Sequence, residues 1–336
     1  MKFSVVIATY NRAAELSETL ESLAALDVAD FWEVIVVDNN STDSTEKTVL
    51  EAANKFPVEL RYIFEKEQGR SAALNAGIRS AKGEIVVVTD DDVRVEKDWL
   101  TKAAEGLEGL KCDYLGGKAL PIWSAPRPKW LPNRGGKHWA VIALLDYGPE
   151  PLELGDRVPL GVNMAFRRDA FTRAGLFDNS IGRKAGTLLG QEVREWCQRA
   201  RAAELRGFYS PDLVVHHVIP IDRLSKKYFR RWFYWHGISR AILYERKGSD
   251  MESPERTSLD FSKVPHIAGV PRYLYRTCLH SFVSMFTSFV RQDPVASFEH
   301  ELWIWFFVGI FKQRWKNRHQ PIPMRLDLPT LPKATT

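Results

Sequence analysis

The sequence predicts an α/β fold, with a mostly parallel sheet that carries helices on both faces. Apolar segments of strand length alternate with segments of helical periodicity over residues 3–89, and each strand-like segment ends in polar residues. The chain has 336 residues, of which 45% are hydrophobic and 26% charged, and this balance is typical of a globular protein. In an open sheet of this kind, a ligand binds beyond the carboxyl ends of the strands.

The N-terminal elements follow one another in strand and helix order. Residues 3–8 are expected to form a buried strand, and Leu16, Leu20 and Leu23 then recur at the spacing of one helix face. The next elements repeat this order, with strands expected at 33–38, 58–64 and 84–89 and a helix at 71–80.

The pattern is less regular after residue 112. Residues 121–160 are rich in Pro, Gly and Trp, and we expect them to form an excursion beside the site. Further helices are expected at 168–174, 191–203, 223–244, 271–290 and 298–318, and a last strand at 213–217. The expected domains are residues 1–221, a helical C-terminal module of residues 222–320 and a flexible tail of residues 321–336.

Positive charge gathers in the C-terminal third. Residues 222–336 hold 19 Lys and Arg against 10 Asp and Glu, although the whole chain carries a net charge of only +5. The same part holds five of the eleven Trp. Basic, aromatic helices are typical of anionic membrane surfaces, so we expect membrane-surface contact through residues 228–238 and 298–315. Alternatively, these aromatic side chains pack the helices onto the first domain or onto a second subunit.

Several classes of function are disfavoured by what the sequence lacks. Its three Cys have neither disulfide nor metal-ligand spacing, and neither GxGxxG nor GxxxxGK[ST] occurs. The longest apolar run, residues 302–311, is shorter than the roughly 20 residues that span a membrane. We read no signal peptide, so a cytoplasmic protein is expected. The basic module has no known reader motif, so no nucleic-acid partner is expected.

The strongest chemical signal is a run of three carboxylates, Asp90, Asp91 and Asp92, directly after the strand at 84–89. Adjacent carboxylates repel one another, and burying them is costly without a cation. Because Mg²⁺ and Mn²⁺ bind carboxylates together with phosphate oxygens, one interpretation is a metal–diphosphate site. The other is a solvated turn that caps the next helix. Asp38, which ends another strand, could likewise bind a pyrimidine base or only cap a turn.

Seven segments in order give a more specific signal. Together they resemble family 2 glycosyltransferases, inverting enzymes with the Rossmann-like GT-A fold, of the type that builds bacterial surface polysaccharide. The resemblance covers residues 3–217, about two thirds of the chain. The segments are VVIATYNR (5–12), VIVVDNNSTD (34–43), GRSAALNAG (69–77), GEIVVVTDDD (83–92), GVNMAFRR (161–168), GQE (190–192) and YSPDLVVHH (209–217).

The resemblance implies a site for a nucleotide-diphosphate sugar. Asp38 would bond the base, Asp90 would bond the ribose, and Asn75 would support the loop that carries Arg70. Asp38 and Arg70 favour a UDP-sugar as the donor. The implied nucleotide-binding residues are Thr9, Asn11, Arg12, Asp38, Arg70, Asn75 and Asp90.

The resemblance also implies a divalent metal, Mn²⁺ or Mg²⁺, and a catalytic base. Asp91 and Asp92 would hold the metal, with Asp92 as the preferred direct ligand. His217 resembles a histidine that approaches the metal or the diphosphate in some members, and its alternative is a structural role. Glu192 stands where the family commonly has the Asp of a Glu-Asp pair. It would be the base, unless it is only an acid favoured by the helix dipole.

The implied function is an inverting, metal-dependent glycosyltransferase of the hexosyltransferase type. It would move a single sugar to a glycan or lipid-linked acceptor in polysaccharide or glycoconjugate biosynthesis, as a peripheral protein at the inner face of the membrane. Single transfer is favoured because Tyr228 replaces the Gln of the Gln-x-x-Arg-Trp motif of processive synthases. A catalytically silent scaffold with the same fold is the alternative, since Gln191 departs from the Glu-Asp pattern.

Overall fold

The computed structural model describes residues 2–132, 137–247, 251 and 264–319. The chain forms two compact units. The first consists of Met1–Gly186 and Glu192–Leu224, and the second of Thr187–Gln191 and Ser225–Thr336. The domain limits expected after residues 221 and 320 stay a prediction, and the tail expected at 321–336 lies outside the described residues.

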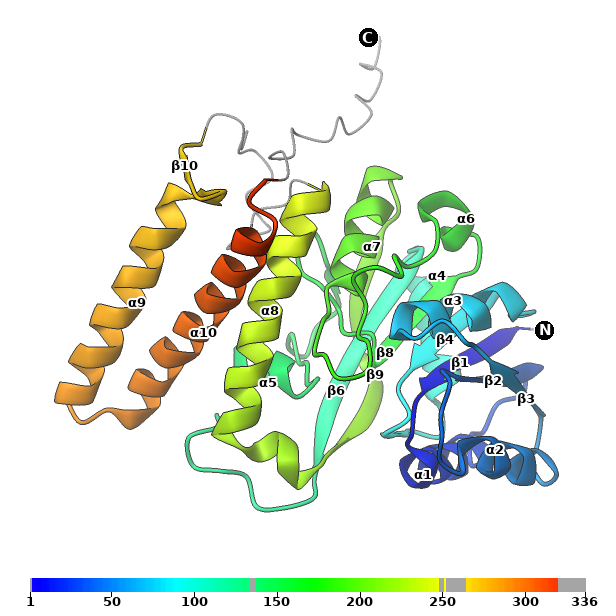
Figure 1. Ribbon diagram of the computed structural model, residues 1–336. Coiled ribbons are helices and arrows are strands. Elements are labelled where there is room, and N and C mark those ends of the chain that lie inside the picture. Colours follow the sequence, from blue (N-terminus) through cyan, green and yellow to red (C-terminus); the bar gives the residue numbers. More distant parts are fainter. Residues whose placement is uncertain (1, 133–136, 248–250, 252–263, 320–336) are drawn as a thin grey trace, which may run out of the picture. The chain divides into compact units, whose positions relative to one another are not determined.

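The first unit is built around one nine-stranded sheet (Figure 1). Its strands are β1 (Phe3–Thr9), β2 (Trp32–Asp38), β3 (Glu59–Phe64), β4 (Ile85–Thr89), β5 (Val93–Val95), β6 (Tyr114–Trp123), β7 (Leu152–Glu153), β8 (Asn163–Arg167) and β9 (Gly207–Ile219). They lie in the order β3-β2-β1-β4-β8-β6-β9-β5, and β7 pairs with β9. The four strands β1 to β4 are parallel, as predicted. Because β1, β2 and β4 are almost continuously apolar and buried, they suit a sheet that is covered on both faces.

Helices cover both faces of this sheet, which confirms the predicted fold class. They are α1 (Ala13–Ala24), α2 (Thr45–Ala53), α3 (Arg70–Ser80), α4 (Trp99–Gly109), α5 (Lys137–Val141), α6 (Ala170–Ala174) and α7 (Glu192–Ala202). One buried cluster joins α1, α2 and α4 to Val5 and Val34, and another joins α3, α6 and α7 to Val6 and Ile35. Successive residues of a strand point to opposite faces, so the two clusters lie on opposite sides of the sheet.

The second half of the sheet departs from the parallel pattern. β8 runs antiparallel to β4 and β6, and β5 runs antiparallel to β9. The sequence did not predict β5 or β6, and it predicted only residues 213–217 of β9. Between Gly117 and Lys118 of β6, the register jumps from Ser210 to Val214 of β9. The skipped residues include Pro211, which has no backbone N–H to donate. The irregularity interrupts the alternation of apolar and polar residues by which a strand is recognised in a sequence.

The second unit is a layer of three long helices with a short hairpin, among the residues described (Figure 1). The elements are α8 (Lys226–Lys247), β10 (His266–Ile267), β11 (Val270–Pro271), α9 (Arg272–Val290) and α10 (Pro294–Lys316). All three predicted helices exist with shifted ends. α10 lies between α8 and α9. A Cβ atom on Gly237 of α8 would lie 1.9 Å from the carbonyl oxygen of Phe306, so α8 and α10 pack backbone to backbone.

The aromatic side chains of α8 and α10 form much of the interior of this unit. The ring centroids of Phe233 and Trp303 lie 5.7 Å apart, and those of His236 and Phe306 lie 5.4 Å apart. These rings therefore have a packing role, which was the alternative to membrane contact. The contacts shown lie within the second unit, whereas the expected packing was against the first domain or a second subunit. Among the helices described, none is both long enough and apolar enough to cross a membrane.

A buried carboxylate ties the first three strands together. Glu33 on β2 accepts hydrogen bonds from Ser4 Oγ at 2.7 Å, from the Lys82 backbone N–H at 2.8 Å and from Arg61 Nη1 at 2.9 Å. Its side chain is fully buried. Burial alone would raise the pKa of Glu33, but these hydrogen bonds outweigh burial and hold the pKa below its usual value.

We expect Glu33→Gln to lower the free energy of unfolding by about 1–3 kcal/mol near neutral pH, because it removes a charged acceptor from buried donors. The pKa of Glu33 is lower in the folded state than in the unfolded state. Its contribution is therefore fully present above the unfolded value of about 4.3 and is lost as pH falls through the folded value. Urea unfolding of both proteins at about pH 7 and about pH 3 measures this difference.

The matched control is Glu59→Gln. Glu59 lies on the neighbouring strand and pairs with Lys82 at 2.8 Å, but its side chain is 48% exposed. An exposed ion pair contributes about 1 kcal/mol or less. An equal loss of stability in both variants, or a Glu33→Gln loss that does not shrink at low pH, would contradict the prediction.

Candidate active site

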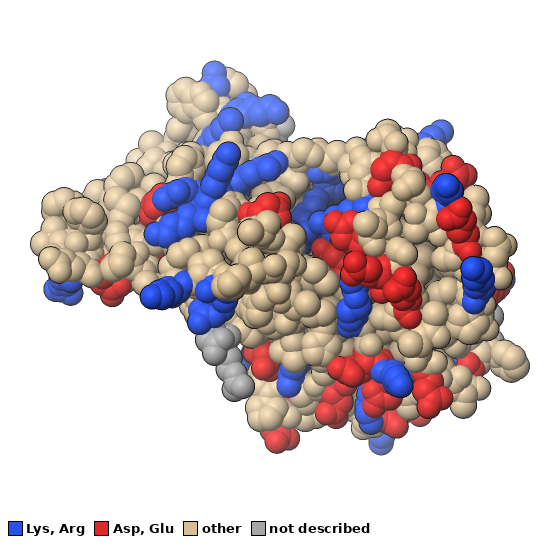
Figure 2. Space-filling model, turned by 90° about the horizontal axis from the view of Figure 1, so that it is seen from below, with Lys and Arg blue, Asp and Glu red and all other residues tan. Residues whose placement is uncertain are grey.

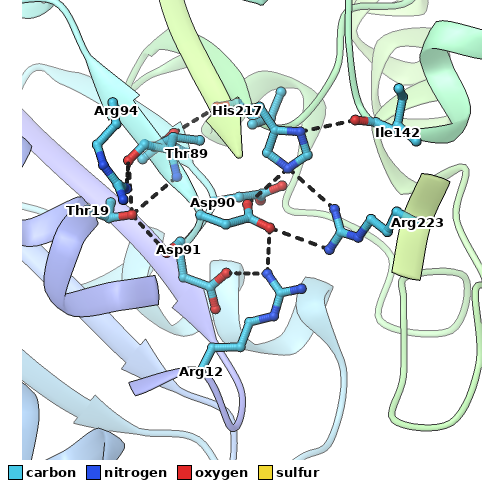
Figure 3. A network of polar contacts seen from close by, with 12 residues as sticks. Arg12, Thr19, Thr89, Asp90, Asp91, Arg94, Ile142, His217 and Arg223 are labelled. Carbon is cyan, nitrogen blue, oxygen red and sulfur yellow. Dashed lines mark hydrogen bonds and ion pairs between the residues drawn. The ribbon is translucent and has the colours of Figure 1, made fainter. Parts of the chain in front are cut away.

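The three carboxylates lie at the end of β4, near the middle of the sheet (Figure 3). Thr89 Oγ1 donates to the backbone carbonyl just before β8 at 2.7 Å, and Thr19 Oγ1 donates to the backbone carbonyl of Asp91 at 2.8 Å. These bonds fix the backbone before and within the carboxylate run. The side chains of Asp91 and Asp92 are only 7% and 5% exposed, whereas that of Asp90 is 27% exposed. Two acidic groups are therefore buried side by side.

Three basic side chains converge on this buried pair (Figure 3). Arg12 Nη1 donates to Asp91 Oδ1 at 2.9 Å and to Asp92 Oδ2 at 2.6 Å. Arg223 Nη2 donates to Asp92 Oδ2 at 3.4 Å, and His217 Nε2 lies 3.0 Å from Asp92 Oδ1. The chain thus supplies its own counter-charges to carboxylates that would otherwise be very costly to bury.

The two buried carboxylates differ in their affinity for a proton. Burial alone would raise the pKa of Asp92, but His217 and the two arginines outweigh burial and hold that pKa well below its usual range. Burial raises the pKa of Asp91 to about 6, although Arg12 opposes the shift and the charge of Asp92 adds to it. Neighbouring acids that interact this strongly titrate as a pair, in which Asp92 is the more strongly ionised.

His217 is oriented by a second contact. Its Nδ1 lies 3.0 Å from the Ile142 carbonyl oxygen, and a carbonyl can only accept, so Nδ1 carries a proton. Nε2 then faces Asp92, either as N–H in a charged ring or as a lone pair. A metal-ligating histidine donates its other ring N–H to a carbonyl in the same way, so the Ile142 contact agrees with a ligand role for Nε2, which stays a prediction.

The structure does not bring the three predicted metal ligands into one group. Within the described ranges, no cluster of three or more His, Cys, Asp or Glu side chains is arranged to hold a metal ion. Asp92 and His217 are together, but Asp91 accepts from Thr9 Oγ1 at 2.8 Å and from Arg12. The Arg12 guanidinium bridges the two carboxylates.

Arg70 connects the ribose candidate to the candidate base. Arg70, which begins α3, donates through Nη2 to Asp90 Oδ1 at 2.6 Å and through Nη1 to Glu192 Oε1 at 3.2 Å. Glu192, which begins α7 and lies 122 positions after Arg70 in the chain, is thereby placed beside the carboxylate run. The backbone of Gln191 has a φ of 98°. Residues other than glycine rarely adopt this backbone conformation, and those that do are concentrated at functional sites.

Other predicted nucleotide residues have contacts within the chain. Asp38 accepts from the Ser41 backbone N–H at 2.9 Å and from the Tyr62 hydroxyl at 2.9 Å. The turn predicted as its alternative role therefore exists, and a contact with a base stays a prediction. Asn11 Oδ1 accepts from the Thr42 backbone N–H at 2.7 Å. Both side chains thus order the loops that follow β1 and β2.

Asn75 is a buried residue of α3 that holds a distant loop. It donates to the Phe177 carbonyl oxygen and to Asn179 Oδ1, both at 2.8 Å, and accepts from the Phe177 N–H at 3.0 Å. These contacts support the loop at 177–179, whereas support of the loop that carries Arg70 and direct contact with a nucleotide both stay predictions.

Sequence reasoning missed Arg223. It lies in a 3-10 turn, Ile221–Leu224, directly after β9, whereas the sequence predicts that residue 223 belongs to the helical module. Its guanidinium contacts both His217, at 3.4 Å, and Asp92. The available signal was a basic residue six positions after His217, close to the end of the last strand.

The comparisons with known proteins decide the family. Residues 4–174, half of the chain, match the family model described as Glycosyl transferase family 2. The chain belongs to glycosyltransferase family 2. This glycosyltransferase is 27% identical to the glucosyl-dolichyl phosphate glucuronosyltransferase of Haloferax volcanii, over 72% of its own length and 77% of that protein. It is 25% identical to the succinoglycan biosynthesis protein ExoM of Rhizobium meliloti, over 84% and 92% of the two chains.

Solved structures share the fold of this glycosyltransferase. The mannosyltransferase PcManGT from Pyrobaculum calidifontis, in complex with GDP-Man and Mn²⁺, is 18% identical with a TM-score of 0.61, over 94% of this chain and 87% of that one. Residues 1–349 of S. aureus TarS are 19% identical with a TM-score of 0.51, over 95% and 92%. These likenesses confirm the predicted GT-A fold.

We expect Asn75→Ala to lower the free energy of unfolding by about 1–3 kcal/mol, because it leaves buried groups of Phe177 without partners. The free energy of donor binding should change by less than the free energy of unfolding, because Asn75 supports the loop at 177–179 and is expected to affect the donor through this loop. Thermal unfolding and donor titration together test this. Asn54→Ala, at an exposed position, is the control and should change stability by less than about 0.5 kcal/mol. Complete loss of donor binding in stably folded Asn75→Ala would instead indicate direct contact.

Proposed function

We propose that this glycosyltransferase transfers a single sugar from a nucleotide-diphosphate sugar to a glycan or lipid-linked acceptor, with inversion at the anomeric carbon. The observation that carries the proposal is the position of Glu192, which Arg70 holds beside Asp90 at the end of β4. A candidate base and a candidate donor site therefore share one edge of the sheet. The names of the relatives, which include a dolichyl phosphate glucuronosyltransferase and a succinoglycan biosynthesis protein, support a role in polysaccharide or glycoconjugate biosynthesis.

The donor is proposed to bind with its diphosphate near Asp92. The GDP-Man in the PcManGT complex supports a nucleotide sugar as donor. Arg12 and Arg223 both contact Asp92, and both guanidinium groups could turn to phosphate oxygens. Asp38 and Arg70 favour a UDP-sugar, and Asp90 is proposed to bind the ribose.

A divalent cation, Mn²⁺ or Mg²⁺, fits Asp92 and His217. The separation of 3.0 Å between His217 Nε2 and Asp92 Oδ1 is about that of two neighbouring ligand atoms on one ion. The Ile142 carbonyl fixes the proton on Nδ1 and leaves Nε2 to bind the ion. When bound, such an ion supplies positive charge to the departing diphosphate. Mn²⁺ in the PcManGT complex supports this assignment.

Glu192 is proposed to act as the base. As the acceptor oxygen forms its bond to the anomeric carbon, the bond from that carbon to the diphosphate oxygen breaks, and the hydroxyl proton passes to the Glu192 carboxylate. Arg70 Nη1, which lies 3.2 Å from Glu192 Oε1, fixes the position of this carboxylate. Because the nucleophile is the acceptor itself, the displacement is direct and needs no covalent intermediate on the enzyme.

We also propose that the protein works as a peripheral protein at the cytoplasmic membrane surface. A lipid-linked acceptor would present its sugar at that surface. The excess of 19 basic over 10 acidic residues in positions 222–336 supports attraction to anionic lipid.

We expect one class among UDP-, GDP- and dTDP-sugars to bind in the presence of Mn²⁺, and Asp92→Ala to weaken that binding at least about tenfold, because it removes the proposed metal ligand. Calorimetric titration with and without EDTA measures both effects. Asp212→Ala, an exposed acid on β9, is the control and should bind as the natural protein does. Undiminished binding by Asp92→Ala, or binding that EDTA leaves unchanged, would contradict the metal assignment.

We expect Glu192→Gln to lower the rate of sugar transfer by about 10²–10⁴-fold while donor binding persists, because Gln retains an oxygen for Arg70 but cannot accept the proton. Release of nucleoside diphosphate in the presence of acceptor measures the rate. The control is Glu204→Gln, an exposed acid shortly after α7. Equal rates for Glu192→Gln and the natural protein would place the base elsewhere.

A further inference from the structure

α9 presents an apolar stripe that the chain leaves exposed. Six side chains, spaced three or four residues apart or adjacent, lie along the helix and are between 48% and 72% exposed. No charged residue occurs between Ser281 and Val290. Large contiguous apolar surface of this kind marks an interaction site. The outer stripe consists of Leu279, Phe282, Val283, Phe286, Phe289 and Val290.

The arrangement of the second unit explains why the outer stripe is uncovered. α9 packs mainly against α10, and α10 in turn packs against α8 (Figure 1). α9 is therefore at the edge of the layer, and only Leu274 and Ser281 on it are buried. The aromatic rings of α8 and α10 are largely used in packing between helices, whereas the phenylalanines of α9 are not.

The charges around the outer stripe suit an anionic partner. α9 contains no Asp or Glu, and Arg272, Arg276 and Arg291 are exposed along or next to it. Residues 225–319 hold 16 Lys and Arg against 8 Asp and Glu. Figure 2 shows basic side chains gathered over this unit beside a broad surface of uncharged residues. A second copy docked on α9 would bring one positive helix against another, so a lipid surface is the better match.

We propose that α9 binds an anionic bilayer, with the outer stripe in the acyl boundary and the flanking arginines at the headgroups. The stretch of α9 without Lys, Arg, Asp or Glu, residues 277–290, has 14 residues and is shorter than the roughly 20 that cross a bilayer, so the helix would lie in the surface. The inference rests on the proposed function in one respect: membrane binding would give the enzyme access to a lipid-linked acceptor. It moves the lipid contact from residues 228–238 and 298–315 to α9.

The test is flotation of the full chain with vesicles of phosphatidylcholine containing about 30% phosphatidylglycerol, against phosphatidylcholine alone. We expect binding to the anionic vesicles to be the stronger. The double variant Phe286→Ser/Phe289→Ser should bind at least about tenfold more weakly, because two large apolar side chains are lost from the contact. The matched control is Phe31→Ser/Phe64→Ser, which removes exposed phenylalanines (84% and 54% exposed) from the first unit and should leave binding unchanged.

Three outcomes would overturn the inference. The first is that the natural protein does not float with anionic vesicles. The second is that Phe286→Ser/Phe289→Ser floats as well as the natural protein. The third is a concentration-dependent dimer in solution that this variant abolishes, since a second copy would then cover the stripe. Donor binding without vesicles is measured in parallel and should be equal in all variants, so a failure of the lipid contact is distinct from a failure of the proposed function.

Discussion

The structure of the site depends on the burial of two adjacent carboxylates, Asp91 and Asp92, at the end of β4. Such groups cannot stay ionised away from water without counter-charges. Those charges come from separate parts of the first unit: Arg12 follows β1, His217 lies in β9 and Arg223 follows it. The sheet order that places β1 beside β4, together with the long β9, is therefore a condition for the site.

The same counter-charges suggest how the site would receive a ligand. Arg12 bridges Asp91 and Asp92, so a cation bound at Asp92 would compete with this guanidinium. A donor that arrives with a divalent ion brings both the cation that could replace Arg12 and the phosphates that could accept it. Arg70 is a second bridge, between Asp90 and Glu192, and under the proposed function it would link occupancy of the donor site to the position of the base. The site would thus exchange ion pairs within the chain for ion pairs with the ligand.

The predictable parts of the fold are those with a strong local pattern. β1, β2 and β4 are apolar runs whose burial on both faces follows from their composition, and the carboxylate run at the end of β4 was visible from the same pattern. β6 was missed because Gly116, Gly117 and Pro121 interrupt the apolar pattern of a strand. The strand forms through its pairing with β9, which is far away in the sequence. Arg223 was missed for a related reason. Its role depends on where the turn after β9 lies, and local periodicity carries no such information.

In the C-terminal unit, composition alone could not show which helix exposes its aromatic side chains. α8, α9 and α10 are all rich in aromatic residues, so each reads as a candidate interfacial helix. The glycines Gly237 and Gly309 let α8 and α10 approach closely enough to bury their rings against each other. α9 has no equivalent partner on its outer side within the described residues, and its phenylalanines stay in water. Exposing so many apolar side chains on one helix is costly, and a partner that removes them from water would recover that free energy.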